Sequence, residues 1–435
     1  MSDTTPAPEL DAHAWAALGE WMRTQRWFAA KGSTPRLRQV SRIDHPSDPD
    51  GAAALTLLLA DDADPRHPVY QVGLVARPST ATEHVVARAP GVALADGARD
   101  PAFAEALVAQ LSAGGAALGD VPRSPAVVFA GEQSNTSLVI PRAGDVDLVL
   151  KLFRVVHHGE NPEIELQRAL SDAGSAVVPR FFGALAAEWT DAAGALGRGD
   201  LVVAQEFVSG AIDGWAHATR AAASGSDFSE AARALGRVTA EAHAVLAREL
   251  GVTEAGDDDV SALMAVWDAR LEAAARVAPQ LAPHLAAIRG RYAAAASVPW
   301  GPLQRIHGDL HLGQALLAPD GRWLLIDFEG EPLRTLAERT RPEPALRDVA
   351  GMLRSFDYAA AAHGGAGRAW AESARAAFLA GYADEVGTAP APTELLAALE
   401  LDKAVYEVSY EAGNRPDWIG IPLAAVARIA AVGEA

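Results

Sequence analysis

His307-Gly308-Asp309-Leu310-His311-Leu312-Gly313-Gln314 and, a short distance on, Asp327-Phe328-Glu329-Gly330-Glu331-Pro332 are the two stretches that decide the fold. Between them the chain predicts a strand, a turn at Pro319-Asp320-Gly321 and a return strand, because proline, aspartate and glycine favour turns. A hairpin brings the ends of its two strands side by side. We therefore expect Gln314 and Asp327 to lie close together.

The residue types in these stretches suit phosphoryl transfer, which needs an aligned hydroxyl group and a metal on the phosphates. Asp309 can accept the proton of a hydroxyl group or orient that group. Gln314 offers a carbonyl oxygen and Asp327 a carboxylate, and Mg²⁺ takes oxygen ligands of this kind. The pattern predicts an ATP-dependent kinase of a small hydroxylated molecule, with Mg²⁺ as its cofactor. His307 and His311 are expected mainly to support the loop, and His311 is also a candidate substrate contact.

The composition is that of an ordinary globular protein, with 435 residues of which 50% are hydrophobic and 21% charged. The formal net charge of −19 disfavours nucleic acid and anionic membrane surfaces as partners. The sequence contains no cysteine, which excludes disulfides, thiolate metal sites and cysteine nucleophiles. The expected partners are ATP and a small molecule.

Targeting signals are not expected in this chain. Residues 1–8 lack a basic start and an apolar stretch, and they read as a disordered tail. The longest apolar run, residues 52–60, is far shorter than the roughly 20 residues that span a bilayer. We therefore expect a cytoplasmic protein without membrane attachment. We also expect a monomer.

A kinase-like order of elements begins near Pro125. It consists of a strand at residues 126–131, a polar turn at 132–137, and two antiparallel strands at 137–140 and 147–153 that are joined at residues 143–144. A helix opened by Asn161-Pro162 follows, and then two further strands at 178–182 and 201–207. This is the order of a protein-kinase N-lobe.

The flanking regions differ in character. Before the N-lobe pattern, residues 11–27 and 102–118 predict helices, and residues 54–60 and 69–75 predict a pair of strands. From Phe228 onward helices dominate: residues 230–250, 260–276, 279–295, 345–362, 368–385 and 393–414.

The expected fold is α+β, a bilobal eukaryotic-protein-kinase-like fold with an N-terminal α+β cap and a mainly helical C-lobe. Residues 1–124 would form the cap and an intermediate subdomain. Residues 125–208 would form the small nucleotide-binding N-lobe, and residues 209–435 the helical C-lobe with the catalytic hairpin and the substrate site.

Lys151 lies within the apolar strand of residues 149–153, where an unpaired charge is unfavourable. The helix after Asn161 offers Glu163 and Glu165 as partners, and we favour Glu165. Its ion pair with Lys151 would direct the ammonium group to the α- and β-phosphates of ATP.

Three further contacts to ATP are predicted by position. The polar turn lacks the glycines of a protein-kinase loop, so it is either a plain hairpin turn or a phosphate cover formed by Ser134, Asn135, Thr136 and Ser137. Gln205 and Phe207 end a strand where a hinge would bind adenine through its backbone. Asp213 would meet the ribose or is a solvated loop acid.

Motifs along nearly the whole chain resemble the aminoglycoside-phosphotransferase-like kinases, and among them the actinobacterial maltokinases and glucosamine kinases. They are Arg26-Trp-Phe28 with Lys31-Gly32, Glu132 to Ser137, Asn161 to Glu165, the two acidic stretches, Leu346 to Tyr358, Tyr406 to Glu411 and Asn414 to Trp418. The resemblance implies ATP, Mg²⁺ and a sugar acceptor, with Asp309 as catalytic base and Gln314 and Asp327 as metal ligands.

The sugar would face the last part of the chain. Trp418 can stack on a pyranose ring, and Glu407 and Glu411, one helical turn apart, can accept from hydroxyl groups or pair with an ammonium group. They could equally be solvated acids and a core tryptophan. The run Trp418-Ile-Gly-Ile-Pro422 departs from the maltokinase pattern. This departure favours glucosamine as the substrate, with glucosamine 6-phosphate as the product. The alternatives are a maltokinase giving maltose 1-phosphate, a non-catalytic pseudokinase and an aminoglycoside phosphotransferase.

Overall fold

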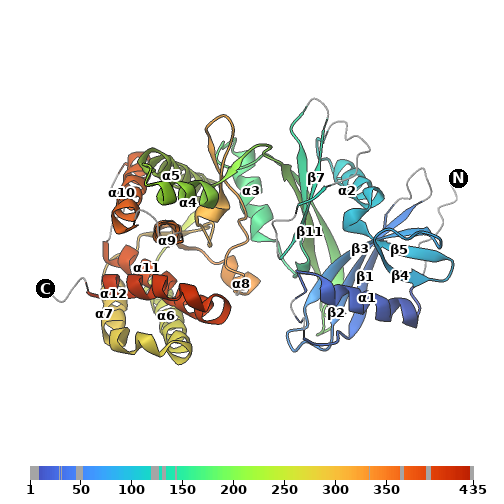
Figure 1. Cartoon of the computed structure of the whole chain (residues 1–435), viewed down its shortest axis with the longest axis horizontal. Helices are drawn as coiled ribbons and strands as arrows, with labels where there is room; N and C mark the ends of the chain where they lie inside the picture. Colours follow the sequence, from blue (N-terminus) through green and yellow to red (C-terminus); the bar gives the residue numbers. More distant parts are fainter. Residues whose placement is uncertain are drawn as a thin grey trace. The chain divides into compact units, whose positions relative to one another are not determined.

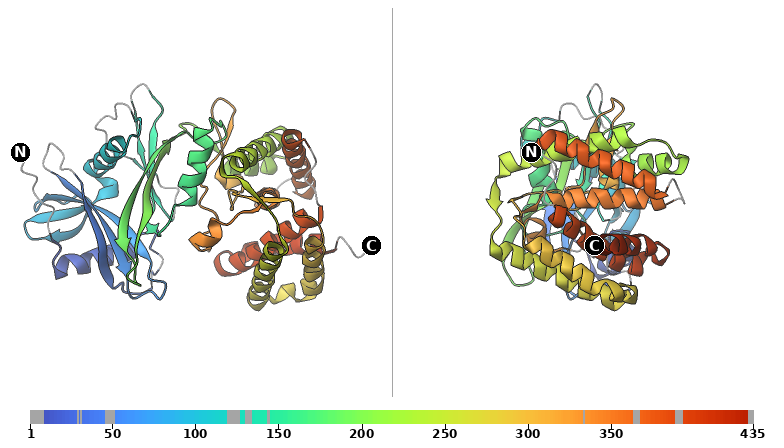
Figure 2. Two further views of the ribbon diagram at one scale, coloured as in Figure 1. Left: turned by 180° about the vertical axis from the view of Figure 1, so that it is seen from behind. Right: turned by 90° about the vertical axis from the view of Figure 1, so that its left-hand side faces the viewer.

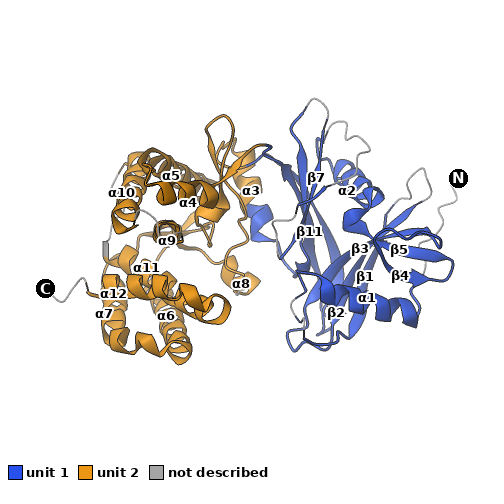
Figure 3. Cartoon of the chain, in the orientation of Figure 1, with its two compact units in different colours: residues 1–165, 179–209 blue, residues 166–178, 210–435 orange. Residues whose placement is uncertain are grey.

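The computed structural model describes residues 9–28, 30, 32–45, 52–118, 127–129, 134–142, 145–332, 334–362, 367–387 and 393–431. The chain divides into two compact units, drawn in different colours in Figure 3. Unit 1 comprises residues 1–165 and 179–209, and unit 2 comprises residues 166–178 and 210–435. The predicted tail, residues 1–8, and the predicted turn at residues 143–144 lie outside the described residues.

The first sheet of unit 1 is antiparallel, with the strand order β1-β2-β3-β5-β4 and the short β9 on β3 (Figure 1). Helix α1, Ala12–Thr24, begins where the Asp11 carboxylate accepts from the Ala14 N–H. The other helix of this region is α2, Pro101–Ala113. The strands are β1 Leu37–Asp44, β2 Ala53–Asp61, β3 Val69–Pro78, β4 Val85–Ala89, β5 Val92–Asp96 and β9 Val155–Val156.

Strand β2 is buried along its whole length, which explains why its sequence is apolar without alternation. Leu55, Leu57 and Leu59 belong to a cluster with α1, whereas Ala54 and Leu58 belong to a second cluster with α2. Successive side chains of a strand point to opposite faces, so β2 joins two cores.

The second sheet of unit 1 is also antiparallel, with the order β10-β11-β8-β7-β6. Its strands are β6 Val127–Val128, β7 Thr136–Ile140, β8 Leu148–Leu152, β10 Phe181–Thr190 and β11 Leu196–Glu206. Its apolar residues share one core with α2, so the cap region and this sheet pack as one body.

Helix α3, Pro162–Asp172, starts at Pro162 as predicted, and Asn161 Oδ1 accepts from the Glu163 N–H at 2.9 Å. Its second half belongs to unit 2, because Leu166, Leu170 and the following Val177 lie in the core of that unit. The expected boundary at 208/209 lies one residue before the division at 209/210. The expected boundary at 124/125 lies among residues that the structure does not describe.

Unit 2 is mainly helical (Figure 2). Helix α11 occupies a central place and contacts α6, α7, α9 and α12. The helices are α4 Gly214–Ser224, α5 Ser229–Leu250, α6 Asp257–Val277, α7 Leu285–Ala296, α8 Leu336–Arg339, α9 Leu346–Ala361, α10 Gly367–Val386, α11 Thr393–Asn414 and α12 Gly420–Ala431.

Two small antiparallel sheets interrupt the helices of unit 2, each with three strands. One contains the predicted hairpin, β15 paired with β16, and the other carries the strand that leads into the His307 stretch. The strands are β12 Ile212–Asp213, β13 Val252–Glu254, β14 Pro302–Gln304, β15 Ala315–Leu317, β16 Trp323–Leu325 and β17 Glu343–Pro344.

Candidate active site

The loop that carries Asp309 is fixed by a buried carboxylate on helix α9. Asp348 accepts from the backbone N–H groups of His307 (2.8 Å) and Gly308 (2.9 Å) and from His243 Nε2 (3.0 Å). Burial alone would raise the pKa of Asp348, but the bond from His243 and the other donors hold this pKa below its ordinary value. The loop is therefore anchored through its backbone.

His307 supports the same loop, as predicted. Its Nε2 lies 2.9 Å from the carbonyl oxygen of Ile326, so Nε2 carries a proton and donates. This bond ties the Asp309 loop to the residue just before Asp327.

Asp309 lies against a lysine that the sequence did not single out. Lys403 Nζ on α11 donates to Asp309 Oδ1 at 2.9 Å and to Glu331 Oε1 at 3.0 Å. Burial would lower the pKa of Lys403, but the charges of Asp309 and Glu331 raise it, so the ammonium group remains charged. One oxygen of the predicted base is thereby held in place.

Glu331 is buried and stabilises this arrangement. Its Oε2 lies 2.8 Å from Arg347, 3.0 Å from Arg334 and 3.7 Å from Arg270. Burial would raise the pKa of Glu331, but Arg347, Lys403 and the other cations hold it well below its ordinary value. Glu331 therefore stays ionised and holds Lys403.

Gln314 and Asp327 lie together, as the hairpin predicted. Gln314 Nε2 donates to Asp327 Oδ2 at 3.0 Å, and the backbone N–H of Ile326 donates to the backbone carbonyl of Gln314. Asp327 has a φ of +66°, a region that non-glycine residues rarely adopt. Such strain is concentrated at functional sites, where the surrounding structure imposes it.

Lys151 lies in β8 between Ser137 of β7 and Val203 of β11, and it is buried. Its Nζ is 3.9 Å from Oε2 of Glu163, which is fully buried. The structure thus favours Glu163 over the predicted Glu165, which is only half-buried on the same helix. The periodicity of the helix did not distinguish the two acids, because only the packing of α3 decides which one faces the sheet.

The polar residues predicted to cover phosphate separate in the structure. Thr136 Oγ1 accepts from Arg154 Nε at 2.8 Å, and Asn135 Oδ1 accepts from the Arg154 backbone N–H at 3.4 Å. Arg154 is buried, and burial lowers its pKa to about 10. Ser137 is buried in β7, which leaves Ser134 as the exposed member of the four. The geometry thus gives Asn135 and Thr136 a structural contact.

The predicted hinge follows β11. The N–H groups of Glu206 and Phe207 donate to the carbonyls of Arg180 and Asp147, and the Phe207 carbonyl accepts from Ser209. Gln205 is buried within the strand. Among the described residues, the Val208 N–H has no backbone acceptor, so it is better suited to bind adenine than the predicted Gln205 and Phe207.

Asp213 and His311 both cap helical turns. Asp213 Oδ1 accepts from the Ala216 N–H at 2.7 Å at the start of α4, and Asp213 is exposed. His311 Nδ1 accepts from the Gly313 N–H at 3.0 Å, and burial lowers the His311 pKa. These contacts give each residue a local structural role.

The predicted substrate residues on α11 are already paired. Oε2 of Glu407 accepts from Arg354 Nε (2.9 Å) and Nη2 (2.7 Å), and its Oε1 has no hydrogen-bond partner among the described residues. Glu411 is buried and accepts from Arg415 and from the Tyr358 hydroxyl. Of the two acids, Glu407 retains the accessible oxygen.

Trp418 is half-buried after α11. Its ring lies nearly parallel to that of Tyr358, with 6.2 Å between the ring centroids, and the Arg415 guanidinium is 4.9 Å from its centroid. Stacking of Trp418 on a sugar would therefore compete with these neighbours.

Metal binding can be tested against the donor atoms. Among the described residues there is no group of three or more histidine or acidic side chains that could hold an ion. The amide and carboxylate of Gln314 and Asp327 nevertheless fit a hard cation that keeps waters and phosphate oxygens as its other ligands.

No described helix is long and apolar enough to cross a membrane.

Two features define the class of kinase-like phosphotransferases. The helical unit holds an anchored acid, Asp309, and the oxygen ligands of Gln314 and Asp327, and a buried lysine on an antiparallel sheet pairs with a glutamate on the following helix. Comparison with known proteins agrees. Residues 21–112 match the maltokinase N-terminal cap domain, and residues 125–396 match the phosphotransferase enzyme family. The chain belongs to the phosphotransferase enzyme family.

Two sequence relatives are glucosamine kinases. The one from Streptacidiphilus jiangxiensis is 30% identical over 323 residues, covering 67% of this chain and 70% of that protein. The one from Mycolicibacterium smegmatis is 29% identical over 328 residues, covering 68% and 77%. A solved glucosamine kinase in complex with glucosamine, ADP and inorganic phosphate superposes with a TM-score of 0.68 at 25% identity, covering 95% of this chain and 99% of that one.

These comparisons confirm the predicted family, the kinase-like α+β fold and an ATP-dependent phosphotransferase activity.

Proposed function

We propose that this enzyme transfers the γ-phosphoryl group of ATP to the 6-hydroxyl of D-glucosamine. The observation that carries the proposal is the similarity over nearly the full length to a kinase solved with glucosamine and ADP. The anchored Asp309 supports it, because this carboxylate has one oxygen fixed by Lys403 and the other available to a hydroxyl group.

Each proposed group has a distinct part in the reaction. Asp309 orients the acceptor hydroxyl and takes its proton, and Lys403 holds the carboxylate. Lys151, paired with Glu163, binds the α- and β-phosphates. Gln314 and Asp327 would hold Mg²⁺, which neutralises charge on the phosphates when it is bound.

Glu407 is the proposed partner of the 2-ammonium group. Burial raises the Glu407 pKa although Arg354 opposes the shift, and a second cation on its Oε1 would stabilise the carboxylate. Glu407→Gln should raise the KM for glucosamine about tenfold or more, since a hydrogen bond to a charged group contributes about 1.5–3 kcal/mol. The kcat should change little.

The test is ADP release measured with glucosamine, maltose and kanamycin as separate acceptors, followed by NMR of the product to locate the phosphate. Glucosamine should be the best substrate, with phosphate on O6. Asp309→Ala should lower kcat by about 10²–10⁴-fold, whereas Asp320→Asn, at the exposed turn of the same hairpin, should match the wild type. Excess chelator should abolish turnover, and added Mg²⁺ should restore it.

Maltose is the second candidate acceptor, because residues 21–112 match the cap domain of maltokinases. Turnover of maltose alone would replace glucosamine by maltose in this proposal. Turnover that survives in Asp309→Ala would contradict the mechanism.

A further inference from the structure

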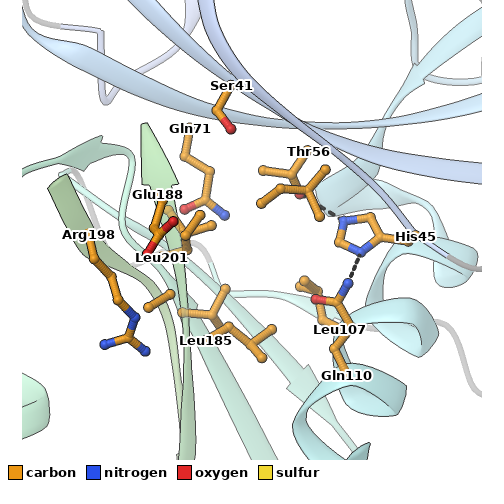
Figure 4. Close-up of a pocket in the computed structure, with 14 residues that line it drawn as sticks. Ser41, His45, Thr56, Gln71, Leu107, Gln110, Leu185, Glu188, Arg198 and Leu201 are labelled. Atoms are coloured by element: carbon orange, nitrogen blue, oxygen red, sulfur yellow. Dashed lines mark hydrogen bonds between the residues drawn. The ribbon is translucent and has the colours of Figure 1, made fainter. Parts of the chain in front are cut away.

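A cavity of about 440 Å³ lies within unit 1, apart from every residue assigned to phosphoryl transfer. It is formed where the first sheet and helix α2 meet strands β10 and β11 of the second sheet (Figure 4). We propose that this cavity binds a small, uncharged, hydroxylated molecule such as a neutral sugar.

A buried hydrogen-bond chain lines one wall. Gln110 Nε2 lies 2.8 Å from His45 Nδ1, and His45 Nε2 lies 2.9 Å from Thr56 Oγ1. The amide NH₂ can only donate, so Nδ1 accepts and Nε2 carries the proton that is donated to Thr56. Burial lowers the His45 pKa to about 4, so the ring is neutral at pH 7 and holds this single proton.

The chain leaves hydrogen-bonding capacity at both ends. The Thr56 hydroxyl has accepted from His45, and its own proton has no acceptor among the described residues, although Thr56 is only 1% exposed. At the other end, the Gln110 carbonyl oxygen has no donor among the described residues. The Ser41 hydroxyl, drawn pointing toward the cavity in Figure 4, adds a third polar group. A buried donor without a partner is unfavourable, so a hydroxylated occupant would supply the missing hydrogen bond.

The remaining lining explains why the occupant is uncharged. The two ionic side chains, Glu188 and Arg198, are exposed cross-strand neighbours of opposite sign, so they give the cavity no net charge. Leu107, Leu185 and Leu201 provide apolar surface. A sugar has both surfaces that this lining requires, since its hydroxyl groups can bond to the polar wall while its C–H face packs on the leucines.

The cavity is also connected to the proposed nucleotide site through one strand. Leu201 and Val202 of β11 line it, and the next residue, Val203, pairs with Lys151 in β8. An occupant of the cavity would therefore contact the strand that pairs with the Lys151 strand. None of the proposed catalytic residues of unit 2 lines the cavity.

The test measures binding of D-glucose and maltose to the full-length protein by calorimetry, with glucose 6-phosphate as the anionic comparison. Thr56→Val removes the hydroxyl at nearly constant volume and should raise the Kd of the neutral sugar about tenfold. Leu185→Trp fills the cavity and should abolish this binding. Thr190→Val, an exposed threonine at the end of β10 that does not line the cavity, is the matched control and should bind as the wild type does.

A crystal structure with maltose identifies the site directly. Maltose or glucose density in the cavity supports the proposal, and unchanged kcat for phosphoryl transfer in Thr56→Val separates this site from the proposed catalytic function. No measurable binding of either neutral sugar, an unchanged Kd in both variants, sugar density in unit 2 alone, or tighter binding of glucose 6-phosphate would overturn it. Circular dichroism of each variant shows whether a loss of binding comes with a loss of fold.

Discussion

Lys403 differs from the other charged residues of α11 because it touches the predicted base. It has two carboxylate partners, Asp309 and Glu331, and only Asp309 has an exposed fraction, 19%, that leaves room for a substrate. Glu331 has three arginines besides Lys403, so it remains neutralised when the lysine is removed. The effect of a Lys403 variant should therefore fall on Asp309.

Lys403→Met should lower kcat by about 10²-fold, because displacing a catalytic group such as the Asp309 carboxylate by about 1 Å can reduce the rate by this factor. The KM for ATP should remain within about twofold, and Lys403→Arg should recover part of kcat by restoring the cation. Steady-state kinetics with melting temperatures measures both. A kcat equal to that of the wild type in Lys403→Met would show that Asp309 needs no such support.

The sequence singles out Asp309, Gln314 and Asp327 through short-range motifs, and the predicted hairpin does bring the last two into contact. It did not anticipate Lys403 or Arg154. Lys403 lies 94 residues after Asp309 in the sequence, and only the packing of α11 brings them into contact. The sequence predicts Asn135 and Thr136 as phosphate-binding residues, because nothing in their local sequence reveals that their side chains accept hydrogen bonds from Arg154.

At the scale of elements, long helices were predicted well and strand ends poorly. The pattern gave residues 393–414 for α11, which are its bounds in the structure. The hairpin of β10 and β11 extends through Thr190 and Leu196, beyond the predicted strands, because its outer part mixes exposed polar residues such as Glu188 and Arg198 with the buried Trp189 and so lacks a continuous apolar signal. Strand β1 was missed for the same reason, since none of its residues is fully buried.

The anchoring of the Asp309 loop on helix α9 predicts a pH-dependent stability. Asp348→Asn places an amide donor against backbone N–H groups and should lower the free energy of unfolding at pH 7 by about 3–5 kcal/mol. Since the pKa of Asp348 is depressed in the folded state, its contribution is complete above the unfolded value of 3.8 and is lost as pH falls through the lower folded value.

Urea unfolding at a series of pH values measures this effect. The difference between wild type and Asp348→Asn should be constant above about pH 4 and shrink below it. Asp384→Asn, which breaks an exposed pair with Arg233, is the control and should change stability by at most about 1 kcal/mol. A difference that grows on acidification would contradict the assigned role.

Helices α5 and α10 approach each other closely enough to require glycine. A Cβ added at Gly236 would meet the carbonyl oxygen of Phe378 and lie 2.7 Å from the backbone nitrogen of Tyr382. Backbone atoms cannot move aside as side chains do, so Gly236→Ala should destabilise by about 1–3 kcal/mol or more. Gly290→Ala in α7 meets nothing within 4 Å and should stabilise by about 0.5–1 kcal/mol. Thermal unfolding of both variants tests the contrast, and a shift of the same sign in both would refute it.

At the scale of the whole molecule, the proposed reaction draws on both compact units. Lys151 and Glu163 belong to unit 1, whereas Asp309, Gln314 and Asp327 belong to unit 2. The chain passes between the units at 165/166, within helix α3, and again at 178/179 and 209/210.

Ligand binding should therefore make the molecule more compact. A non-hydrolysable ATP analogue with Mg²⁺ and glucosamine should reduce the radius of gyration in small-angle scattering, because closure over substrates excludes water from phosphoryl transfer. Lys151→Met should weaken the response by removing the phosphate contact of unit 1, and Asp327→Asn should do so from unit 2. Arg233→Met, at an exposed pair remote from both sets, should respond as the wild type does. An unchanged radius of gyration at saturating ligand would contradict closure on ligand binding.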